Sequence, residues 1–407
     1  MSIRWIFAII LAGALGVTEA ARAQTPDYAA IRAAEADQEA VALDAAVQAS
    51  CNQRLVLLGE NGFHGDGRTS AFKADLVRRL VLECGFDAVI FEASLYDFIA
   101  LNQAIRRGAA TPDMLSSAIG GLWNQNREVQ DLIAFLFAEA REGRIDLAGM
   151  DNQLGSRGAF YSLERMPQDL AALLPVGRRE DCAARLRQRI WSQFSAAEPY
   201  AEAHRTALRQ CLDEIDVALN QVAPANPAER VEYLTMTSGY RRALDRDFLA
   251  PSALVQSRDR DMAYSVREIV EGLPADVRLI VWTANVHAAR SGAATTTYRE
   301  APTMGAWLDQ FYGSDVFAVG FAAAGGTYRF NGGSREIDAA ETGSLEAMAL
   351  ASTQNEVVWL GSADIASLGT VVGSIFQYHQ PVTATWSEVF DGVVVFRAER
   401  PPYRLDE

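Results

Sequence analysis

Glu60 and His64 are a pair whose types and spacing suggest chemistry in this 407-residue chain. They follow the apolar run Leu55–Leu58, within the glycine-rich sequence Gly59-Glu-Asn-Gly-Phe-His-Gly65. A short apolar run bounded by glycine predicts a buried strand, and the glycines allow a tight turn close to a ligand. A carboxylate and an imidazole are therefore predicted together at the carboxyl end of a strand, where open α/β sheets bind ligands. The alternative is a solvated surface turn.

The next apolar runs along the chain end near polar residues of the same kinds. Glu92 ends one run, Asp151 ends another, and Asn285 and His287 follow a third. If the four strands are parallel, their carboxyl ends lie at one edge of the sheet, and these side chains gather there. For Glu92 and Asp151, capping of the following helices is an alternative role.

These residue types predict hydrolysis by an activated water molecule. A histidine can take a proton from water, while a neighbouring carboxylate fixes its tautomer and stabilises the imidazolium. If Glu60 and Glu92 lie close together, one carboxyl pKa is expected to rise and supply an acid. The chain has no Gly-x-Ser-x-Gly nucleophile elbow and no phosphate-binding loop. Two histidines with two glutamates leave a divalent-metal hydrolase as an alternative.

Two arginines and a tryptophan are candidates for contacts with a substrate. Arg258 and Arg260 lie in Ser257-Arg-Asp-Arg-Asp-Met262, before the fourth strand, where they could neutralise the acidic edge or bind a substrate oxygen. A solvated, salt-bridged helix start is the alternative for both arginines. Trp123 could form an apolar wall for a bulky ligand.

The elements that must position these residues predict an α/β fold with a central, mostly parallel sheet flanked by helices. The first two strands and the helix between them, which ends near residue 83, form a βαβ unit with a right-handed crossover. Residues 160–270 are predicted to be an all-helical insertion over the ligand edge of one domain, 24–407. Strands are predicted at 55–58, 87–92, 145–151, 277–283, 316–322, 326–330, 356–360 and 392–396.

Residues 1–23 have the pattern of a secretory signal peptide. Arg4 precedes the apolar stretch Trp5–Val17, and Ala21-Arg-Ala23 is a small-x-small cleavage site. We therefore expect an exported protein, with the periplasm as its destination and no membrane anchor after cleavage. An uncleaved anchor is the alternative.

Composition narrows the class of partner. The chain has 52 acidic and 37 basic residues and a net charge of −15, which argues against binding nucleic acid or anionic membranes. A small-molecule substrate is expected, without a cofactor. Four cysteines in an exported chain allow disulfides. We favour the pairs Cys51–Cys84 and Cys182–Cys211, and two other connectivities remain open.

At this point the sequence resembles the erythromycin esterase family over most of its mature length. Gly59–Gly65 is similar to the family's Gly-Glu-x-x-His-Gly signature, with one additional residue between Glu and His. Ser257–Arg260 precedes a strand that ends in Ala284-Asn-Val-His287. Further matching pieces are Phe91-Glu92, Leu122-Trp123 with Glu128, Gly149–Gln153, Met304-Gly305, Gly343–Glu346 and Asp391-Gly392.

The resemblance implies metal-independent hydrolysis of a macrolide lactone, the chemistry of resistance to such antibiotics. A histidine among glutamates would activate the water. Carried over to this chain, the roles are His64 as the base, Glu60 and Glu92 as the residues that position it or the water, His287 as the second histidine, and Arg258 or Arg260 as the contact to substrate or oxyanion.

The chain departs from the family at Ala284, which stands where its His-Asn-x-His motif has the first histidine. A relative that binds a ligand without turning it over is therefore the rival class. The sequence as a whole favours a hydrolase that cleaves an ester or lactone with water, and a metal-dependent hydrolase at the same cleft is the alternative among enzymes.

Overall fold

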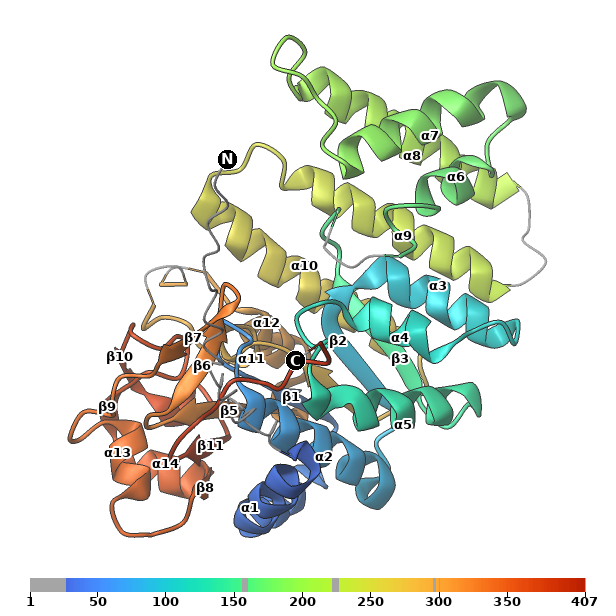
Figure 1. Cartoon of the computed structure of the whole chain (residues 1–407). Helices are drawn as coiled ribbons and strands as arrows, with labels where there is room; N and C mark the ends of the chain where they lie inside the picture. Colours follow the sequence, from blue (N-terminus) through green and yellow to red (C-terminus); the bar gives the residue numbers. More distant parts are fainter. Residues whose placement is uncertain (1–26, 156–159, 222–226, 296–297, 300, 407) are drawn as a thin grey trace, which may run out of the picture.

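A seven-stranded sheet forms the centre of the fold (Figure 1). The computed structural model describes residues 27–155, 160–221, 227–295, 298–299 and 301–406. The strands of the central sheet in this range are β1 (Leu55–Leu58), β2 (Ala88–Ser94), β3 (Asp146–Asp151), β4 (Leu279–Trp282), β5 (Val316–Ala323), β8 (Val357–Gly361) and β11 (Gly392–Phe396). Their order is β3-β2-β4-β1-β5-β11-β8, and neighbours are parallel apart from β11 and β8. The predicted fold class is therefore confirmed.

Two small antiparallel sheets lie outside the central one. β6 (Thr327–Phe330) pairs with β7 (Gly333–Glu336), and β9 (Thr370–Gly373) pairs with β10 (Val382–Thr385). The prediction that 326–330 is a strand of the central sheet is wrong. Asn331 and Gly332 both have positive φ, as tight hairpin turns require, so the chain folds back on itself after β6 instead of joining the sheet.

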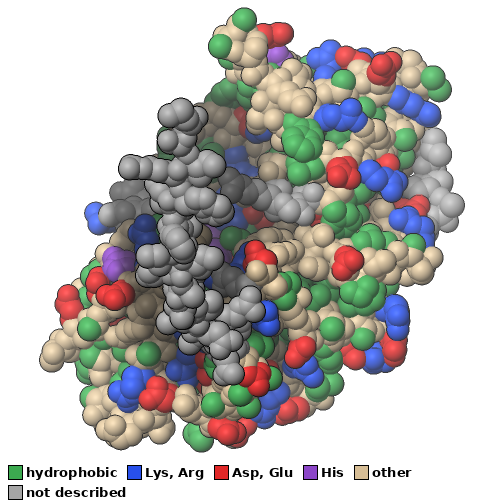
Figure 2. Space-filling model, viewed as in Figure 1, with side chains coloured by type: hydrophobic (Ala, Val, Ile, Leu, Met, Phe, Trp, Pro, Cys, Tyr) green, Lys and Arg blue, Asp and Glu red, His purple; other side chains and the backbone are tan. Residues whose placement is uncertain are grey.

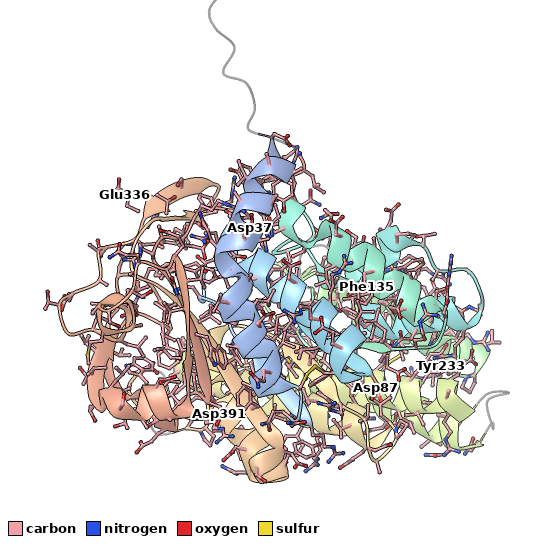
Figure 3. The ribbon with its side chains drawn as sticks, turned by 90° about the horizontal axis from the view of Figure 1, so that it is seen from below. Asp37, Asp87, Phe135, Tyr233, Glu336 and Asp391 are labelled. Carbon is pink, nitrogen blue, oxygen red and sulfur yellow. A yellow bond between two sulfur atoms is a disulfide. The ribbon has the colours of Figure 1, made fainter. Side chains whose placement is uncertain are left out.

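Helices cover both faces of the central sheet, because successive residues of each strand point to opposite sides. Val56 and Leu58 of β1 pack in one core with α1 (Tyr28–Ser50), α2 (Gly67–Cys84) and α5 (Gln130–Arg141). Leu55 and Leu57 pack in a second core with α10 (Pro251–Glu271) and α12 (Met304–Tyr312). Figure 3 shows α1, which carries Asp37, crossing the first of these faces.

The described residues between 160 and 270 form helices and connecting segments, with no strand. The helices are α6 (Met166–Ala171), α7 (Val176–Ile190), α8 (Glu202–Gln221), α9 (Pro227–Asp245) and α10, and the first four lie at the top of Figure 1. The helices α6 to α9 share a third core with α3 (Leu95–Arg106), whereas α10 packs in the second core. The assignment of 160–270 as an insertion stays a prediction.

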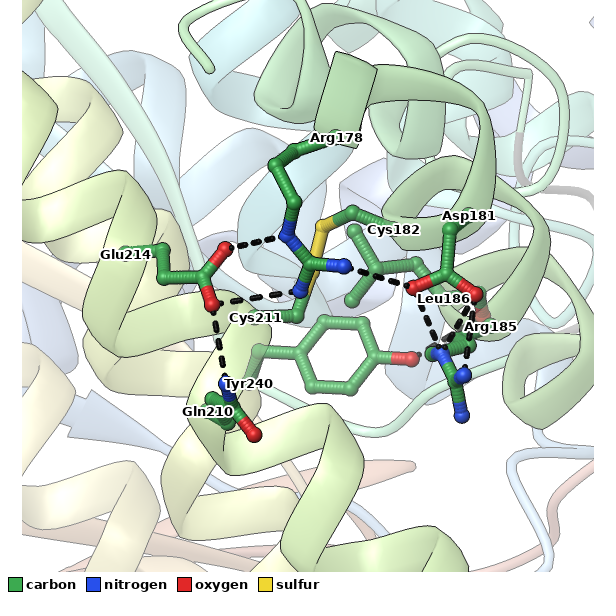
Figure 4. The surroundings of a disulfide bond; sticks show 9 residues. All are labelled: Arg178, Asp181, Cys182, Arg185, Leu186, Gln210, Cys211, Glu214 and Tyr240. Atoms are coloured by element: carbon green, nitrogen blue, oxygen red, sulfur yellow. Dashed lines mark hydrogen bonds and ion pairs between the residues drawn. A yellow bond between two sulfur atoms is a disulfide. The ribbon is translucent and has the colours of Figure 1, made fainter. Parts of the chain in front are cut away.

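Both predicted disulfides are confirmed. Cys51–Cys84 joins the carboxyl ends of α1 and α2, with 5.1 Å between the Cα atoms. Cys182–Cys211 joins α7 to α8 beside the ion pair of Arg178 with Glu214 (Figure 4).

The remaining elements are short. They are α4 (Pro112–Ile119), η1 (Arg127–Val129), α11 (Asn285–Ala288), η2 (Gly313–Asp315), α13 (Leu345–Leu350), α14 (Ser362–Leu368) and η3 (Trp386–Glu388). The predicted signal peptide lies outside the described residues. Within those residues, no helix combines the length and the apolar character needed to cross a membrane.

Candidate functional site

The strand order sets the polar side chains in a row. β3, β2, β4 and β1 are parallel neighbours, so their carboxyl ends lie side by side at one edge of the sheet. In that order the strands deliver Asp151, Glu92, the pair Asn285 and His287, and the pair Glu60 and His64. These residues therefore lie near one another at one edge of the sheet, as the sequence predicted.

Glu60 is a fully enclosed carboxylate that accepts three hydrogen bonds. Nδ1 of His64 lies 2.6 Å from Oε1, Nε1 of Trp123 donates to the same oxygen at 2.7 Å, and Nζ of Lys73 donates to Oε2 at 2.8 Å. Burial alone raises the pKa of Glu60, but the Lys73 charge and the His64 contact outweigh it and lower the pKa. Glu60 therefore stays ionised and can only accept hydrogen bonds.

His64 is held in one orientation by its backbone and by its neighbours. Its φ of 53° lies in the left-handed region, a strained conformation that local packing must maintain. Gly65 follows because a Cβ there would overlap the backbone of Arg329 on β6. The ionised carboxylate of Glu60 can only accept a hydrogen bond from Nδ1 of His64. The neutral imidazole therefore carries its proton on Nδ1 and keeps a lone pair on Nε2. The ring also meets Trp123 edge-on, with centroids 5.3 Å apart.

Glu92 is a second ionised carboxylate. Oε2 accepts hydrogen bonds from Oγ1 of Thr283 at 2.8 Å and from the backbone N–H of Ala284 at 3.0 Å. Oε1 accepts one from Nη2 of Arg258 at 2.9 Å. Burial alone raises the pKa of Glu92, but the positive charges of His287 and Arg258 hold it well below its ordinary value.

The expectation that two nearby glutamates would raise one carboxyl pKa is wrong. Glu60 and Glu92 each have a cation of their own, Lys73 and Arg258, and the pKa values of both carboxyl groups are lowered. Neither glutamate supplies an acid, so any acid must come from another group.

His287 is a buried cation at neutral pH. Burial alone lowers its pKa, but the carboxylates of Asp259 and Glu92 outweigh burial and raise the pKa to about 10. Nδ1 lies 2.8 Å from Oδ1 of Asp259, and Nε2 lies 3.4 Å from Oε1 of Glu92. Asp259 is itself fixed by the N–H of Met304 and the hydroxyl of Tyr298.

Arg258 joins the row of strand ends from α10. Its Nη2 lies 2.7 Å from Oδ2 of Asp151 and 2.9 Å from Oε1 of Glu92, and its Nη1 lies 3.2 Å from Nε2 of His287. Arg260 is placed elsewhere. Its side chain is 46% exposed and its Nη2 contacts Ser257 and Asp261 instead of the strand ends.

Asn285 is committed to the scaffold. Its Nδ2 donates to the carbonyls of Phe321 and Ile375 at 2.7 Å each, and its Oδ1 accepts from the N–H of Phe321 at 3.0 Å. The residue is fully buried, so its amide joins β5 to the β4 end.

Two residues of the site were not predicted, Lys73 and Asp259. A signal existed for Lys73, because Leu76, Val77 and Leu80 follow it at helical spacing, which places a charge on the apolar face of α2. For Asp259 the sequence offered none, since alternating Arg and Asp in Ser257–Met262 do not reveal which side chains face inward.

Two adjoining cavities lie above these strand ends. The large chamber, of about 700 Å³, is lined by residues that follow β1 and β4, including His64 and His287. The small chamber, of about 440 Å³, is lined by residues of β2, β3 and the loop before η1. Both volumes fall within the roughly 300–1,000 Å³ of ligand sites. The residues that border both chambers are Glu92, Leu122, Gln153 and Arg258.

A metal-binding arrangement is not found in the described part of the chain. No group of three or more His, Cys, Asp or Glu side chains there is placed to hold a metal ion. Instead, the guanidinium of Arg258 occupies the position between Glu92 and Asp151 that a cation would take.

Comparison with known proteins gives one family and three similar folds. The model of the erythromycin esterase family matches residues 81–398, which include Glu92, Arg258 and His287 but not Glu60 or His64. A succinoglycan biosynthesis protein is similar in structure, with a TM-score of 0.68, 15% identity, and coverage of 89% of this chain and 91% of that one.

Two further solved structures are similar. A Bacillus cereus protein has a TM-score of 0.65 at 15% identity, with coverage of 86% of this chain and 90% of that one. A mutant of the erythromycin esterase EreC in its open conformation has a TM-score of 0.61 at 17% identity, with coverage of 86% and 92%. At these identities the likeness shows a shared fold.

Proposed function

The chain belongs to the erythromycin esterase family, and from this premise we propose that it hydrolyses a carboxylic ester or lactone with a water molecule that His64 activates. Membership in this family indicates a hydrolase. The observation that carries the finer proposal is the contact of His64 with the ionised Glu60 at the wall of the large chamber.

His64 is the general base. Glu60 holds the proton on Nδ1, so Nε2 accepts a proton from water as the oxygen attacks the carbonyl carbon. A tetrahedral intermediate forms with negative charge on the former carbonyl oxygen. The carbon–oxygen bond to the leaving group then breaks, and the proton on Nε2 passes to the departing alkoxide. The products are a carboxylic acid and an alcohol, so atoms and protons balance.

Arg258 and His287 stabilise the negative charge of the intermediate. Both are cations beside the same chamber, and Glu92 and Asp259 hold them in place. Fixed positive groups at the point where charge develops lower the barrier because they need no reorganisation. Glu60, Glu92, Lys73 and Trp123 are positioning residues in this scheme.

The compartment proposed is the periplasm. Two disulfides in the described structure support an oxidising environment, since such bonds are rare in the cytosol. The proposed partner is a small molecule.

The test is hydrolysis of a panel running from simple esters to macrolides, by the wild type and by His64→Ala. We expect His64→Ala to lower kcat by about 10²- to 10⁴-fold, the usual contribution of a general base. His204→Ala, which alters a histidine on α8 outside both chambers, is the matched control. Equal rates for the wild type and His64→Ala would sink the assignment of the base.

A second candidate is a ligand-binding protein without turnover, and Ala284 is the observation that favours it. Ala284 lines the large chamber where the family motif has a histidine. Binding of esters or macrolides with no hydrolysis of any of them would favour this candidate. Hydrolysis that chelator treatment abolishes would instead favour a metal-dependent enzyme.

A further inference from the structure

We propose that Glu399 is a positioning residue for the base, because it caps the amino end of α2, the helix that follows the turn of His64. Glu399 lies in the segment 398–401, which follows β11. This inference rests on the hydrolase function proposed above, and it adds to that site a residue outside the linings of both chambers.

The amino end of α2 is capped by a residue that is distant in the sequence. Oε1 of Glu399 accepts a hydrogen bond from the backbone N–H of Arg68 at 2.6 Å. Oε2 accepts one from the N–H of Thr69 at 3.1 Å and one from its hydroxyl at 2.8 Å. The first N–H groups of a helix have no partner within the helix, so Glu399 satisfies two of them and places an acceptor at the positive end of the helix dipole.

Asp66 holds the usual capping position of α2 but makes no capping bond with its side chain. The side chain is buried, and within the described residues neither carboxyl oxygen makes a well-formed hydrogen bond, although the hydroxyl of Tyr378 approaches it. Burial raises the pKa of Asp66 well above its ordinary value, and the carboxyl groups of Glu399 and Glu60 raise it further. Asp66 is therefore neutral at pH 7.

Asp66 and Glu399 together carry one negative charge, and it lies on Glu399. Burial raises the pKa of Glu399 as well, but the hydrogen bonds that it accepts from backbone N–H groups and from Thr69 limit this rise. Its carboxyl oxygens accept four hydrogen bonds, the fourth from the N–H of Arg400 at 2.9 Å. A group that only accepts fits the ionised form, so Glu399 is the charged cap and Asp66 keeps the proton.

The segment 398–401 also holds the first turn of α2 through its backbone. The N–H of Gly67 donates to the carbonyl of Arg400 at 2.7 Å, and Nη1 of Arg68 donates to the carbonyl of Ala398 at 3.1 Å. A Cβ on Gly67 would overlap the carbonyl of Pro401, so this close approach requires a glycine. The amino end of α2 therefore has a fixed position against this segment.

The position of α2 determines the geometry of the base. His64 precedes the helix by three residues, and Lys73 lies in its second turn. These two residues contact the two oxygens of Glu60, at 2.6 Å for Nδ1 of His64 and 2.8 Å for Nζ of Lys73. A shift of the amino end of α2 therefore moves both of them relative to Glu60, and a small displacement of an oriented base lowers the rate.

The test compares three exchanges of a carboxyl group for an amide of the same shape, Glu399→Gln, Asp66→Asn and Asp391→Asn. Asp391 precedes β11 and accepts a hydrogen bond from the N–H of Ala318 at 2.8 Å, away from α2, so its exchange reports general destabilisation. We measure kcat and KM on the best ester of the panel above, and melting temperatures. Proton NMR follows the downfield resonance of the Nδ1–H of His64, assigned by its absence in His64→Ala.

We expect Glu399→Gln to lower kcat about tenfold with less than a twofold change in KM, because the neutral amide turns a donor towards the N–H groups of α2. The resonance of His64 should shift or broaden in this variant. Asp66→Asn replaces a neutral acid that makes no capping bond, so it should change kcat by less than twofold at neutral pH and leave the resonance in place. Asp391→Asn should lower the melting temperature with the same small effect on kcat.

The outcomes separate this inference from the proposed function. A changed His64 resonance in Glu399→Gln alone, without hydrolysis of any ester by the wild type, would support the positioning by Glu399 and overturn the hydrolase function. Hydrolysis with the same kcat and the same resonance in the wild type and Glu399→Gln would leave the hydrolase function standing and overturn the positioning. Equal losses of kcat in Glu399→Gln and in either of the other two variants would also overturn it.

Discussion

At the scale of single residues, the carboxylate of Glu60 is shared among three donors from three different elements. His64 follows β1, Lys73 lies on α2, and Trp123 precedes η1. Burial also lowers the pKa of Lys73, to about 8. The positive charge of Lys73 thus offsets the cost of burying the carboxylate of Glu60, and the ion pair depends on both charges being present.

Replacing Lys73 with methionine should impair His64 as a general base without leaving a cavity in the core. We expect Lys73→Met to lower kcat about 10- to 100-fold, part of what a positioned general base contributes, with a smaller change in KM. Without the charge of Lys73 the pKa of Glu60 rises, so the acid limb of the plot of kcat against pH should move to higher pH. Arg79→Met, at a partly exposed cation on the same helix, is the control. A kcat profile unchanged in position would show that Lys73 does not act through Glu60.

His287 predicts how stability depends on pH. Its folded-state pKa is raised to about 10 from 6.5, so the folded protein binds more protons between these values than the unfolded chain does. The contribution to stability is complete below pH 6.5 and is lost as the pH rises towards 10. With ~1.4 kcal/mol for each pKa unit, the loss is on the order of 5 kcal/mol.

Urea unfolding of the wild type and of His287→Gln, at pH 6.5 and at pH 9.5, checks this dependence. The free energy of unfolding of the wild type should be lower at pH 9.5 than at pH 6.5, and that of His287→Gln should decrease much less. His204→Gln is the control and should follow the wild type. A parallel fall in all three proteins would contradict the assignment to His287.

The sequence predicted which ionisable residues lie at the strand ends, but it did not predict which side chains they pair with. The gathering of Glu60, Glu92 and His287 follows from parallel strands, whose ends meet by geometry. Which cation neutralises which carboxylate depends on side-chain packing between elements distant in sequence. Arg258 and Arg260 looked equivalent, yet two residues along a helix is about 200° of rotation, so one faces the strand ends and the other faces solvent.

At the scale of elements, the loop after β1 is held from outside by the β6–β7 hairpin. Phe63, next to His64, stacks on Tyr328 at 5.3 Å and meets Phe330 edge-on at 4.8 Å between centroids. The N–H of Arg329 donates to the carbonyl of Gly65 at 2.9 Å. These contacts maintain the left-handed backbone of His64, which the loop alone would not favour.

Loosening this contact should affect catalysis more than binding. We expect Phe63→Ala to lower kcat about tenfold, with little change in KM, because a small displacement of an oriented group is costly to the rate. Phe135→Ala, which alters a similarly half-buried phenylalanine on α5, is the control. Steady-state kinetics with thermal melts of both variants make the comparison. Equal losses in kcat for the two would show that the effect is general destabilisation.

The strands that the sequence predicted correctly are those buried on both faces, which appear as continuous apolar runs. β1 and β4 are fully buried apolar runs, and both were found within a few residues. β7 is fully exposed and carries Gly333, Ser334, Arg335 and Glu336, so no apolar pattern marks it. β6 was recognised as a strand, but its partner was not, because pairing is set by the turn at Asn331 and Gly332.

At the scale of the whole molecule, charge is spread over the surface, and a further internal ion-pair network lies apart from the strand ends. Figure 2 shows acidic and basic side chains interspersed over the face in view. Inside, Arg400 near the end of the chain pairs with Glu35 of α1 and Glu128 of η1, at 2.6 Å each. This network joins the two ends of the described chain to the same face of the sheet.

Breaking this network should destabilise the protein. Arg400→Met leaves Glu128, whose side chain is fully buried, without its cation, and we expect the free energy of unfolding to fall by about 3 kcal/mol. Arg144→Met breaks ion pairs with Glu139 and Glu142 at the surface and should leave the free energy of unfolding almost unchanged. Urea unfolding at neutral pH measures both. Similar values for the two variants would show that burial adds nothing to the Arg400 pairs.

The order of the strands also governs when the sheet can form. β2 has a neighbour close by in the sequence, β3, whereas both neighbours of β1 are β4 and β5, which begin at Leu279 and Val316. A growing chain therefore carries β1 with both edges unpaired until most of its length has been synthesised. Such distant pairing makes folding slow and leaves apolar strand edges open to aggregation in the meantime. The strand that leads into Glu60 and His64 is thus enclosed late, and a chain shortened before β4 would lack both of its partners.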